Sequence, residues 1–438
     1  MKKRFVKTAF YYFPCALLAA CAALLLGACP LEPGVHSSLD HSFAENGVFR
    51  LLISSSNNYG RAIAVTAGGS IIVGGDYYES GQYHIALLCL GQDGALYMPF
   101  GALGVRTNTT PGLHSVKKIV IQPDGKIVVA AEYYNTTGGT RDFAVLRYTQ
   151  NGDVDATFSA DGMAVTDIDG DLDQVLDIAL QPDGRIVAAG YTMSGGHKDI
   201  VAVRYNANGS LDTTFADNGI FVFATADQDD WARTVAVTSD GKILLAGDMD
   251  YVTYHTCAIA MRLNADGSID DSYGFLGLAI VEPSLHYETC VRVEPHLNNK
   301  TTLYGHSGES GGGLVLSRRL YAGGPDTSFG LNGKIILDMG HAYDYCVGGY
   351  VDEMSNLVAA CSFSAGTGSG IAVVKCRNDG TLVASFGNNN GIETTYLLDS
   401  VTASGLSHQA DGKILVVGTA TESVPVSRSY ITVTRYLP

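Results

Sequence analysis

The chain has 438 residues, of which 46% are hydrophobic and 16% are charged, and its formal net charge is −16 at pH 7. Such an acidic protein is a poor partner for nucleic acid or bare anionic lipid, because like charges repel. The length is ample to bury a sizeable hydrophobic core.

Residues 1–28 have the features of a lipoprotein signal peptide, which is excluded from reasoning about the fold. Four basic residues among the first seven precede a short apolar stretch, and Leu26-Gly27-Ala28-Cys29 resembles a lipobox. Cys29 is the expected lipidation site, and residues 29–37 are the expected lipidated tether. The alternatives are an ordinary secretory signal and, with less support, a transmembrane helix, because the apolar stretch is short and Pro30 follows it at once.

Lipidation predicts an extracytoplasmic protein anchored to a bacterial membrane, with the outer membrane or the cell surface as the favoured location. Removal of residues 1–28 takes away four basic and no acidic side chains, which lowers the net charge from −16 to −20. We therefore expect contact with the membrane through the anchor alone and no nucleic-acid partner.

Two signatures recur seven times along the rest of the chain. The first is Asp-Gly-Lys-Ile, clearest at Asp124, Asp183, Asp240 and Asp411, and its copies are 56 to 59 residues apart. The second is an aromatic residue with Gly four or five positions later, at Phe43, Phe100, Phe158, Phe215, Tyr273, Phe329 and Phe386. A repeat of this length predicts a solenoid, a propeller or an array of domains.

Each repeat has the pattern of four short strands. In one unit the apolar runs 234–237 and 242–247 flank Asp240-Gly241, which is a strong hairpin signal because Gly tolerates a positive φ. Seven such units and no convincing long helix predict an all-β, seven-bladed β-propeller with four-stranded antiparallel blades over residues 38–438. An open β-solenoid is the alternative, but its repeats are usually shorter than about 30 residues.

The ends of the repeat array predict how the ring closes. Residues 47–53 have the pattern of a fourth strand without the preceding three, and residues 431–436 have that of a third strand without a fourth. We therefore expect the N-terminal strand to be the outermost strand of the last blade, which removes the exposed sheet edges of an open array.

The segments 181–187 (QPDGRIV), 202–206 (AVRYN) and 211–215 (LDTTF) resemble the bacterial delta-60 repeat. The resemblance covers about residues 37–437. That family is one of β-propeller-forming repeats in secreted and surface proteins, without an assigned function. The resemblance therefore implies the fold and supplies no catalytic residues.

Aromatic residues concentrate in the segments expected to join the second strand to the third and one blade to the next, which share one face. Tyr has a flat apolar ring and a polar tip, which suits sugars and protein partners. We expect a ligand-binding face here, although aromatics at these positions also cap the ends of blades. The candidate residues are Tyr77, Tyr78, Tyr133, Tyr134, Tyr191, Trp231, Tyr251, Tyr254, Tyr287 and Tyr343.

Asp167, Asp169 and Asp171 alternate in the way that a calcium loop begins. The twelfth position from Asp167 is Ile178 and not the Glu of an EF-hand, so a solvated acidic loop is favoured over a Ca²⁺ site. We expect no other metal or cofactor, since the His residues show no zinc-binding spacing and no phosphate loop is present.

Basic residues recur at equivalent third-strand positions, which marks them as part of the blade architecture, paired with Asp155, Asp212 and Asp270. These residues are Arg147, Arg204, Arg262, Lys375 and Arg435. The six cysteines after Cys29 do not recur in every unit. We therefore expect them to be small buried residues. The alternative is that a pair such as Cys346 and Cys361 oxidises to a disulfide.

These features together predict a monomeric binding or interaction module for a glycan or an envelope protein, which acts through its Tyr- and Asp-rich face. An enzyme is less favoured. It would be a polysaccharide hydrolase or lyase with its site in the central funnel, an alternative that rests on analogy with other propellers. A scaffold for envelope assembly is the third alternative.

Overall fold

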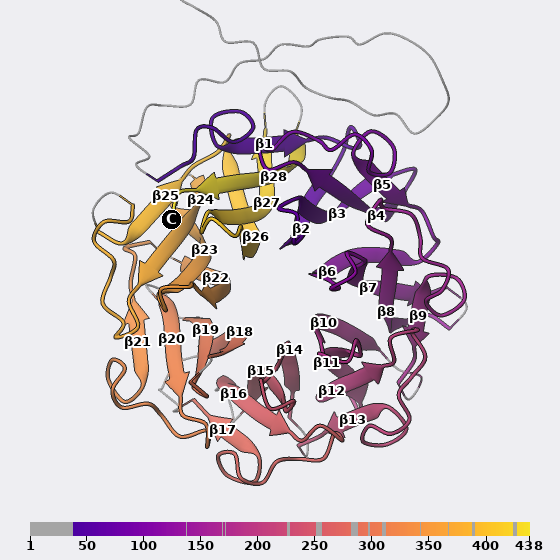
Figure 1. The fold of residues 1–438 in the computed structure, drawn as a ribbon, viewed down its shortest axis with the longest axis vertical. Coiled ribbons are helices and arrows are strands. Elements are labelled where there is room, and N and C mark those ends of the chain that lie inside the picture. The colour runs from indigo at the N-terminus through magenta and orange to yellow at the C-terminus, as the bar shows by residue number, and fades with distance from the viewer. Residues whose placement is uncertain are drawn as a thin grey trace, which may run out of the picture.

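The computed structural model describes residues 38–438 apart from residues 137, 169, 171, 226–227, 251–255, 282–287, 297, 309–311, 342, 367, 388–389 and 424–426. The described chain forms seven four-stranded antiparallel sheets, arranged as blades around a central axis (Figure 1). The predicted seven-bladed propeller is therefore confirmed. Within these ranges no helix has the length and apolar character needed to cross a membrane. The predicted signal peptide, Cys29 and the tether lie outside the described residues.

The first four blades contain β2 to β17, numbered from the innermost strand outward within each blade. Their strands are β2 (Asn58–Val65), β3 (Ile71–Glu79), β4 (Gln82–Leu90), β5 (Val105–Asn108), β6 (Leu113–Ile121), β7 (Ile127–Asn135), β8 (Thr140–Tyr148), β9 (Met163–Thr166), β10 (Asp173–Leu180), β11 (Ile186–Ser194), β12 (His197–Tyr205), β13 (Ile220–Phe223), β14 (Asp230–Val237), β15 (Ile243–Asp250), β16 (Thr256–Leu263) and β17 (Leu278–Ile280).

Blades 5 and 6 repeat this order, and blade 7 takes its fourth strand from the start of the described chain. The strands are β18 (Glu288–Pro295), β19 (Thr301–Ser307), β20 (Leu314–Arg319), β21 (Lys334–Leu337), β22 (Tyr343–Val351), β23 (Leu357–Ala365), β24 (Gly368–Cys376), β25 (Ile392–Thr395), β26 (Ser400–His408), β27 (Ile414–Glu422), β28 (Arg428–Tyr436) and β1 (Val48–Leu51).

The ring closes as the sequence predicts. Strand β1 pairs antiparallel with β28, from Val48 opposite Thr434 to Leu51 opposite Ile431. In Figure 1 the indigo β1 lies beside the yellow β28. A carboxylate just before β1 strengthens this closure, because Asp40 Oδ2 lies 2.9 Å from an Arg435 nitrogen. The two ends of the array therefore share one sheet and one buried ion pair.

The hydrophobic core lies between neighbouring blades. One cluster joins Val128 and Ala130 of β7 to Val175 and Ile178 of β10, and equivalent clusters occur around the ring. The aromatic anchor Phe158 is fully buried in the same cluster. Apolar residues on both surfaces of each middle strand are thus covered by the adjacent blades.

The anchor and its glycine form a local turn at the start of each fourth strand. Gly162 donates its N–H to the carbonyl of Phe158 at 2.7 Å and has a φ of 89°. A Cβ at this position would lie 2.2 Å from Val154 Cγ1. Only glycine meets both requirements without strain, which explains why it recurs after each anchor aromatic.

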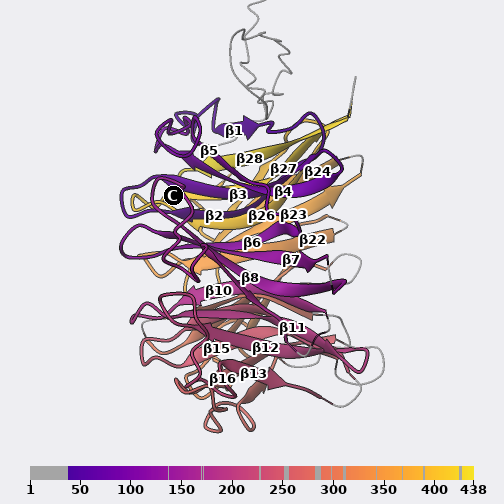
Figure 2. The same ribbon diagram turned by 90° about the vertical axis from the view of Figure 1, so that its right-hand side faces the viewer.

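The ring has two faces, and its strands run between them in the edge view of Figure 2. The hairpin face contains the Asp-Gly turns that join first to second strands. The upper face contains the turns from second to third strands, such as Ser80-Gly81, and the connections between blades. The predicted binding residues that the structure describes lie at the upper-face ends of their strands.

Candidate functional site

The structure places the described aromatic candidates at the ends of strands and not in loops as the sequence predicts. Tyr78 lies in β3, Tyr133 and Tyr134 lie in β7, Tyr191 lies in β11, and Trp231 lies in β14. The second and third strands of these blades are joined by very short turns, so the loops predicted from the sequence are longer than those in the structure. Tyr134 is 42% exposed, whereas Tyr133, Tyr191 and Trp231 are half-buried.

The prediction that Tyr77 belongs to the binding face is wrong. It is only 1% exposed, because β3 is buried on both surfaces as far as this residue. Its ring packs in the core between blades 7 and 1 and presents no surface to a ligand. The predicted residues Tyr251, Tyr254 and Tyr287, and the side chain of Tyr343, lie outside the described part of the chain.

The innermost strand of each blade is irregular. In each blade the pairing of the first and second strands is interrupted by a β-bulge, for example between Val175 and Asp177 or between Ala232 and Thr234. A bulge re-aims the side chains beside it. Gln174 and Trp231, which immediately precede these bulges, are both partly exposed.

Basic side chains occupy the bulge in three blades, and each contacts a buried carboxylate of its own second strand. Arg61 Nε lies 2.6 Å from Asp76 Oδ2, Lys117 contacts Glu132, and Arg233 contacts Asp248. In the other blades the bulge residues are uncharged: Leu176, Val291, Val347 and Ser404. The inner surface therefore presents cations whose carboxylate partners are buried behind them.

The chain's only tryptophan is the centre of a cluster at the inner edge of the upper face over blades 3 and 4. Lys198 Nζ lies 4.3 Å from the centroid of the Trp231 ring and 5.4 Å from that of Tyr191. The Arg233 guanidinium lies 5.1 Å from the Trp231 centroid. Cations at these distances are attracted to aromatic faces. Asp229 orients Lys198 through a 3.4 Å contact. We call Tyr191, Lys198, Trp231 and Arg233 the Trp231 cluster.

A hydrogen-bond chain joins this cluster to blade 2. The Tyr191 hydroxyl donates to Gln174 Oε1 at 2.8 Å, and Gln174 Nε2 donates to Glu132 Oε1 at 2.5 Å. Glu132 also lies 3.3 Å from His114 and 3.5 Å from Arg141. Burial opposes ionisation of Glu132, but hydrogen bonding to His114 and the charge of Lys117 outweigh it and lower the pKa to about 2. Glu132 is therefore an ionised structural acceptor at neutral pH.

We expect Glu132→Gln to lower the pKa of His114. The hydrogen bond to Glu132 raises this pKa above its ordinary value of 6.5, against the opposing effect of burial. The stability contributed by His114 is thus present below pH 6.5 and is lost as the pH rises through the raised pKa. An NMR titration of the histidine resonances measures the change, with His296 as the control. An unchanged pKa for His114 would contradict the assigned contact.

Of the three predicted calcium residues, only Asp167 lies among the described residues. Asp169 and Asp171 lie outside the described residues, whereas Asp167 is exposed beside two carboxylates that the sequence did not single out, Asp142 of β8 and Asp173 of β10. One oxygen of each of these three carboxylates lies within 4.8 Å of the others. The arrangement depends on three strand ends and not on one loop.

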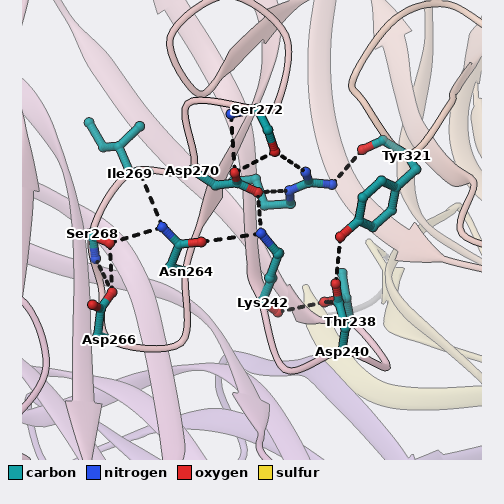
Figure 3. A network of polar contacts seen from close by, with 11 residues as sticks. Thr238, Asp240, Lys242, Asn264, Asp266, Ser268, Ile269, Asp270, Ser272 and Tyr321 are labelled. Atoms are coloured by element: carbon teal, nitrogen blue, oxygen red, sulfur yellow. Dashed lines mark hydrogen bonds and ion pairs between the residues drawn. The ribbon is translucent and has the colours of Figure 1, made fainter.

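The recurring basic residues form the predicted ion pairs on the hairpin face. Arg147, Arg204 and Arg262 contact Asp155, Asp212 and Asp270 at 2.6 to 2.8 Å. Figure 3 shows the unit around Asp270, where Lys242 approaches the same carboxylate and Tyr321 comes from the following blade. Their repetition around the ring confirms a role in the architecture.

The six cysteines of the described residues are free and buried. Cys346 and Cys361 face each other across β22 and β23. The prediction that the cysteines are small buried residues is therefore confirmed. The pair named for the disulfide alternative lies on adjacent strands, with both thiols free.

A cavity of about 510 Å³ lies outside the predicted face, between the outer strands β5 and β9. Its lining includes Asn108 and Tyr148, whose side chains hydrogen-bond at 3.0 Å. Its lining mixes polar residues with Leu146, Val154 and Met163, and its aromatic residue, Tyr148, is only 1% exposed. We therefore regard the Trp231 cluster as the stronger candidate.

Sequence reasoning missed Lys198, Gln174 and Arg233. The distance in sequence from the anchor aromatic could have identified Gln174. It lies sixteen residues after Phe158, as Trp231 lies sixteen residues after Phe215. That offset marks the side chain before the bulge in both blades. The positions of Lys198 and Arg233 around the ring of Trp231 depend on the packing of neighbouring strands.

Three kinds of comparison place the chain among known proteins. None of the curated proteins matches it. Among solved structures, a polysaccharide lyase described as an ulvan lyase of a new family, PL25, is similar at a TM-score of 0.51 and 12% identity over 91% of this chain and 95% of that one. A virginiamycin B lyase from Staphylococcus aureus has a TM-score of 0.49 and 12% identity, over 88% and 98% of the two chains. At these identities the likeness shows the fold alone.

A family model matches the repeats themselves. The family is described as a domain of unknown function (DUF5122) β-propeller, and the matches cover residues 69–96, 122–158, 181–215, 238–273 and 409–432. They lie in five of the seven blades, and four of them contain the Asp-Gly turn between the first and second strands. The predicted resemblance to a propeller-forming repeat family is therefore confirmed, and segments of five repeats in this chain match the model of the DUF5122 β-propeller family.

Proposed function

We propose that the protein is a carbohydrate-binding module whose site is the Trp231 cluster. The observation that carries the proposal is the half-buried ring of Trp231 on the inner edge of the upper face, with Lys198 over it and Tyr191 beside it. An aromatic face suits the apolar face of a sugar ring, and neighbouring polar groups suit its hydroxyls. Gln174 and the Tyr191 hydroxyl supply such groups.

The proposed setting is extracytoplasmic, with a lipid on Cys29 as the membrane anchor. The basic N-terminus, the short apolar stretch and the lipobox-like residues 26–29 support it. A ligand-binding ring held at a membrane by a tether would meet glycans of the envelope or of the surroundings. An envelope protein is the other class of partner that the upper face would suit.

The alternative of a polysaccharide lyase or hydrolase has less support from the geometry. A general acid or base must come within hydrogen-bond reach of its substrate. Asp76, Glu132 and Asp248 are instead buried and form ion pairs with Arg61, Lys117 and Arg233. The ulvan lyase has the same fold, but fold alone does not transfer an activity.

The single tryptophan gives a direct test, because its fluorescence reports on the proposed site alone. We expect titration of the protein with oligosaccharides to produce a saturable change in Trp231 emission. In calorimetry with the same sugar, Trp231→Ala should weaken binding by about 30-fold or more, as expected for a central aromatic contact.

Tyr345 provides a matched control for this experiment. It lies sixteen residues after its anchor Phe329, as Trp231 does after Phe215, but it belongs to blade 6 and is 48% exposed. Tyr345→Ala should leave the affinity unchanged. A flat fluorescence response across a panel of neutral and acidic oligosaccharides would refute the carbohydrate proposal and favour a protein partner.

A further inference from the structure

We propose that Asp142, Asp167 and Asp173 form a binding site for a divalent cation with a preference for oxygen ligands, Ca²⁺ in particular, at the junction of blades 2 and 3. The site is independent of the proposed carbohydrate site. It also differs from a calcium loop, because the three ligands come from three separate places: the start of β8, the residue that follows β9 and the first residue of β10.

The geometry fits a single ion. One carboxylate oxygen from each residue lies within 4.8 Å of the other two. Calcium binds oxygen at about 2.3–2.6 Å, so two of its ligands can be as much as about 5 Å apart. An ion between the three side chains can therefore contact all of them, and water or backbone carbonyls would complete its shell of about six to eight ligands.

The burial of two ligands provides the second, independent argument. Asp142 is 2% exposed and Asp173 is fully buried. Asp173 Oδ2 accepts the backbone N–H of Ile168 at 2.5 Å, whereas its buried Oδ1 has no hydrogen-bond partner among the residues that the structure describes. Buried carboxylates are normally paired with a cation or a metal ion. Within the described ranges, no Lys, Arg or His forms an ion pair with any of the three carboxylates.

The closeness of the three carboxylates favours a cation between them. Carboxylates within this distance repel one another when ionised, and their joint ionisation is costly without a counterion. A divalent cation at this junction would supply the opposite charge.

The next blade contains a matched arrangement that lacks one ligand. Asp199 and Asp230, each 57 residues after Asp142 and Asp173, are both buried. The third position, 57 residues after Asp167, is the exposed Ala224. The hydroxyl and N–H of Thr225 donate to Asp230 Oδ2. The chain thus contains a two-carboxylate version of the same junction.

The test is thermal unfolding of the purified protein, freed of metal with EDTA, with and without about 5 mM Ca²⁺, which saturates even weak extracellular sites of roughly 10⁻⁴–10⁻³ M. We expect Ca²⁺ to raise the melting temperature by about 2–4 °C or more. Asp167→Ala, an exposed change that copies the next blade, should abolish the shift. Asp230→Asn should preserve it.

Terbium luminescence provides the second readout, because Tyr133 lies opposite Asp142 in the β7–β8 pairing and can sensitise a bound ion. Asp142→Asn should remove the signal. Ala224→Asp should add a second site at the junction of blades 3 and 4. The proposal is overturned if neither Ca²⁺ nor Mg²⁺ shifts the melting temperature and terbium gives no signal. A shift that survives in both Asp167→Ala and Asp142→Asn would overturn it equally.

Discussion

Arg204→Ala is expected to lower the free energy of unfolding by about 3–5 kcal/mol, because it removes the buried partner of a buried carboxylate. The Arg204 side chain is only 4% exposed, and its Nε lies 2.8 Å from Asp212 Oδ2. Its guanidinium lies 4.5 Å from the centroid of the anchor Phe215 and also donates to the carbonyl of Ala265 in the next blade. One side chain therefore joins a third strand, an anchor and the neighbouring blade.

Arg185 is the matched control for this prediction. Its Nε approaches the same Asp212 oxygen at 3.0 Å, but its side chain is 39% exposed. Exposed ion pairs contribute about 0–1 kcal/mol, so Arg185→Ala should have little effect. Urea denaturation followed by circular dichroism measures both variants. Equal losses from the two substitutions would show that burial of the pair is not what stabilises the blade.

Removal of the closing strand is expected to have the second large effect. A fragment that begins at residue 54 lacks β1, the anchor Phe43 and the carboxylate of Asp40. We expect it to be aggregated or unfolded at temperatures where the fragment 38–438 is a folded monomer. The comparison requires only size-exclusion chromatography with light scattering and a thermal melt.

The physical reason is that the short segment that closes the ring makes several contributions to the free energy of folding. Phe43 is fully buried, and Val48 and Leu51 are 4% and 2% exposed. Each such side chain contributes about 1.5–3 kcal/mol by burial, whereas folded proteins as a whole are stable by about 5–15 kcal/mol. The fragment also leaves Arg435 buried without Asp40 and exposes the edge of β28 to other chains.

A monomeric fragment 54–438 with an unchanged melting temperature would contradict this account of closure. It would mean that six complete blades and a three-stranded seventh blade are sufficient. The intermediate outcome, a folded dimer, would agree with it, because a second chain would then cover the exposed edge of β28.

The repeat positions were predictable from the sequence because their chemistry is local. An Asp-Gly turn between two apolar runs forms a hairpin wherever it stands, and Gly162 is required by a turn that closes within four residues. The buried pairs of Arg147, Arg204 and Arg262 were predictable for the same reason, since each partner lies eight residues along the chain. The closure of the ring was predictable because the last repeat lacks a fourth strand and the start of the repeat array supplies one, β1.

The candidate sites depended on distances that no local pattern encodes. Tyr77 has the same residue type as Tyr78, but strand alternation and the neighbouring blade bury one and leave the other half-buried. Lys198 and Trp231 are 33 residues apart and meet only because two blades pack together. Asp142, Asp167 and Asp173 converge from three strand ends in the same way. The sequence by itself determined the number of blades, their turns and their closure, through contacts made within each repeat. Only the tertiary structure decided which side chains share a surface, because the bulges and the packing of adjacent blades determine where each one points.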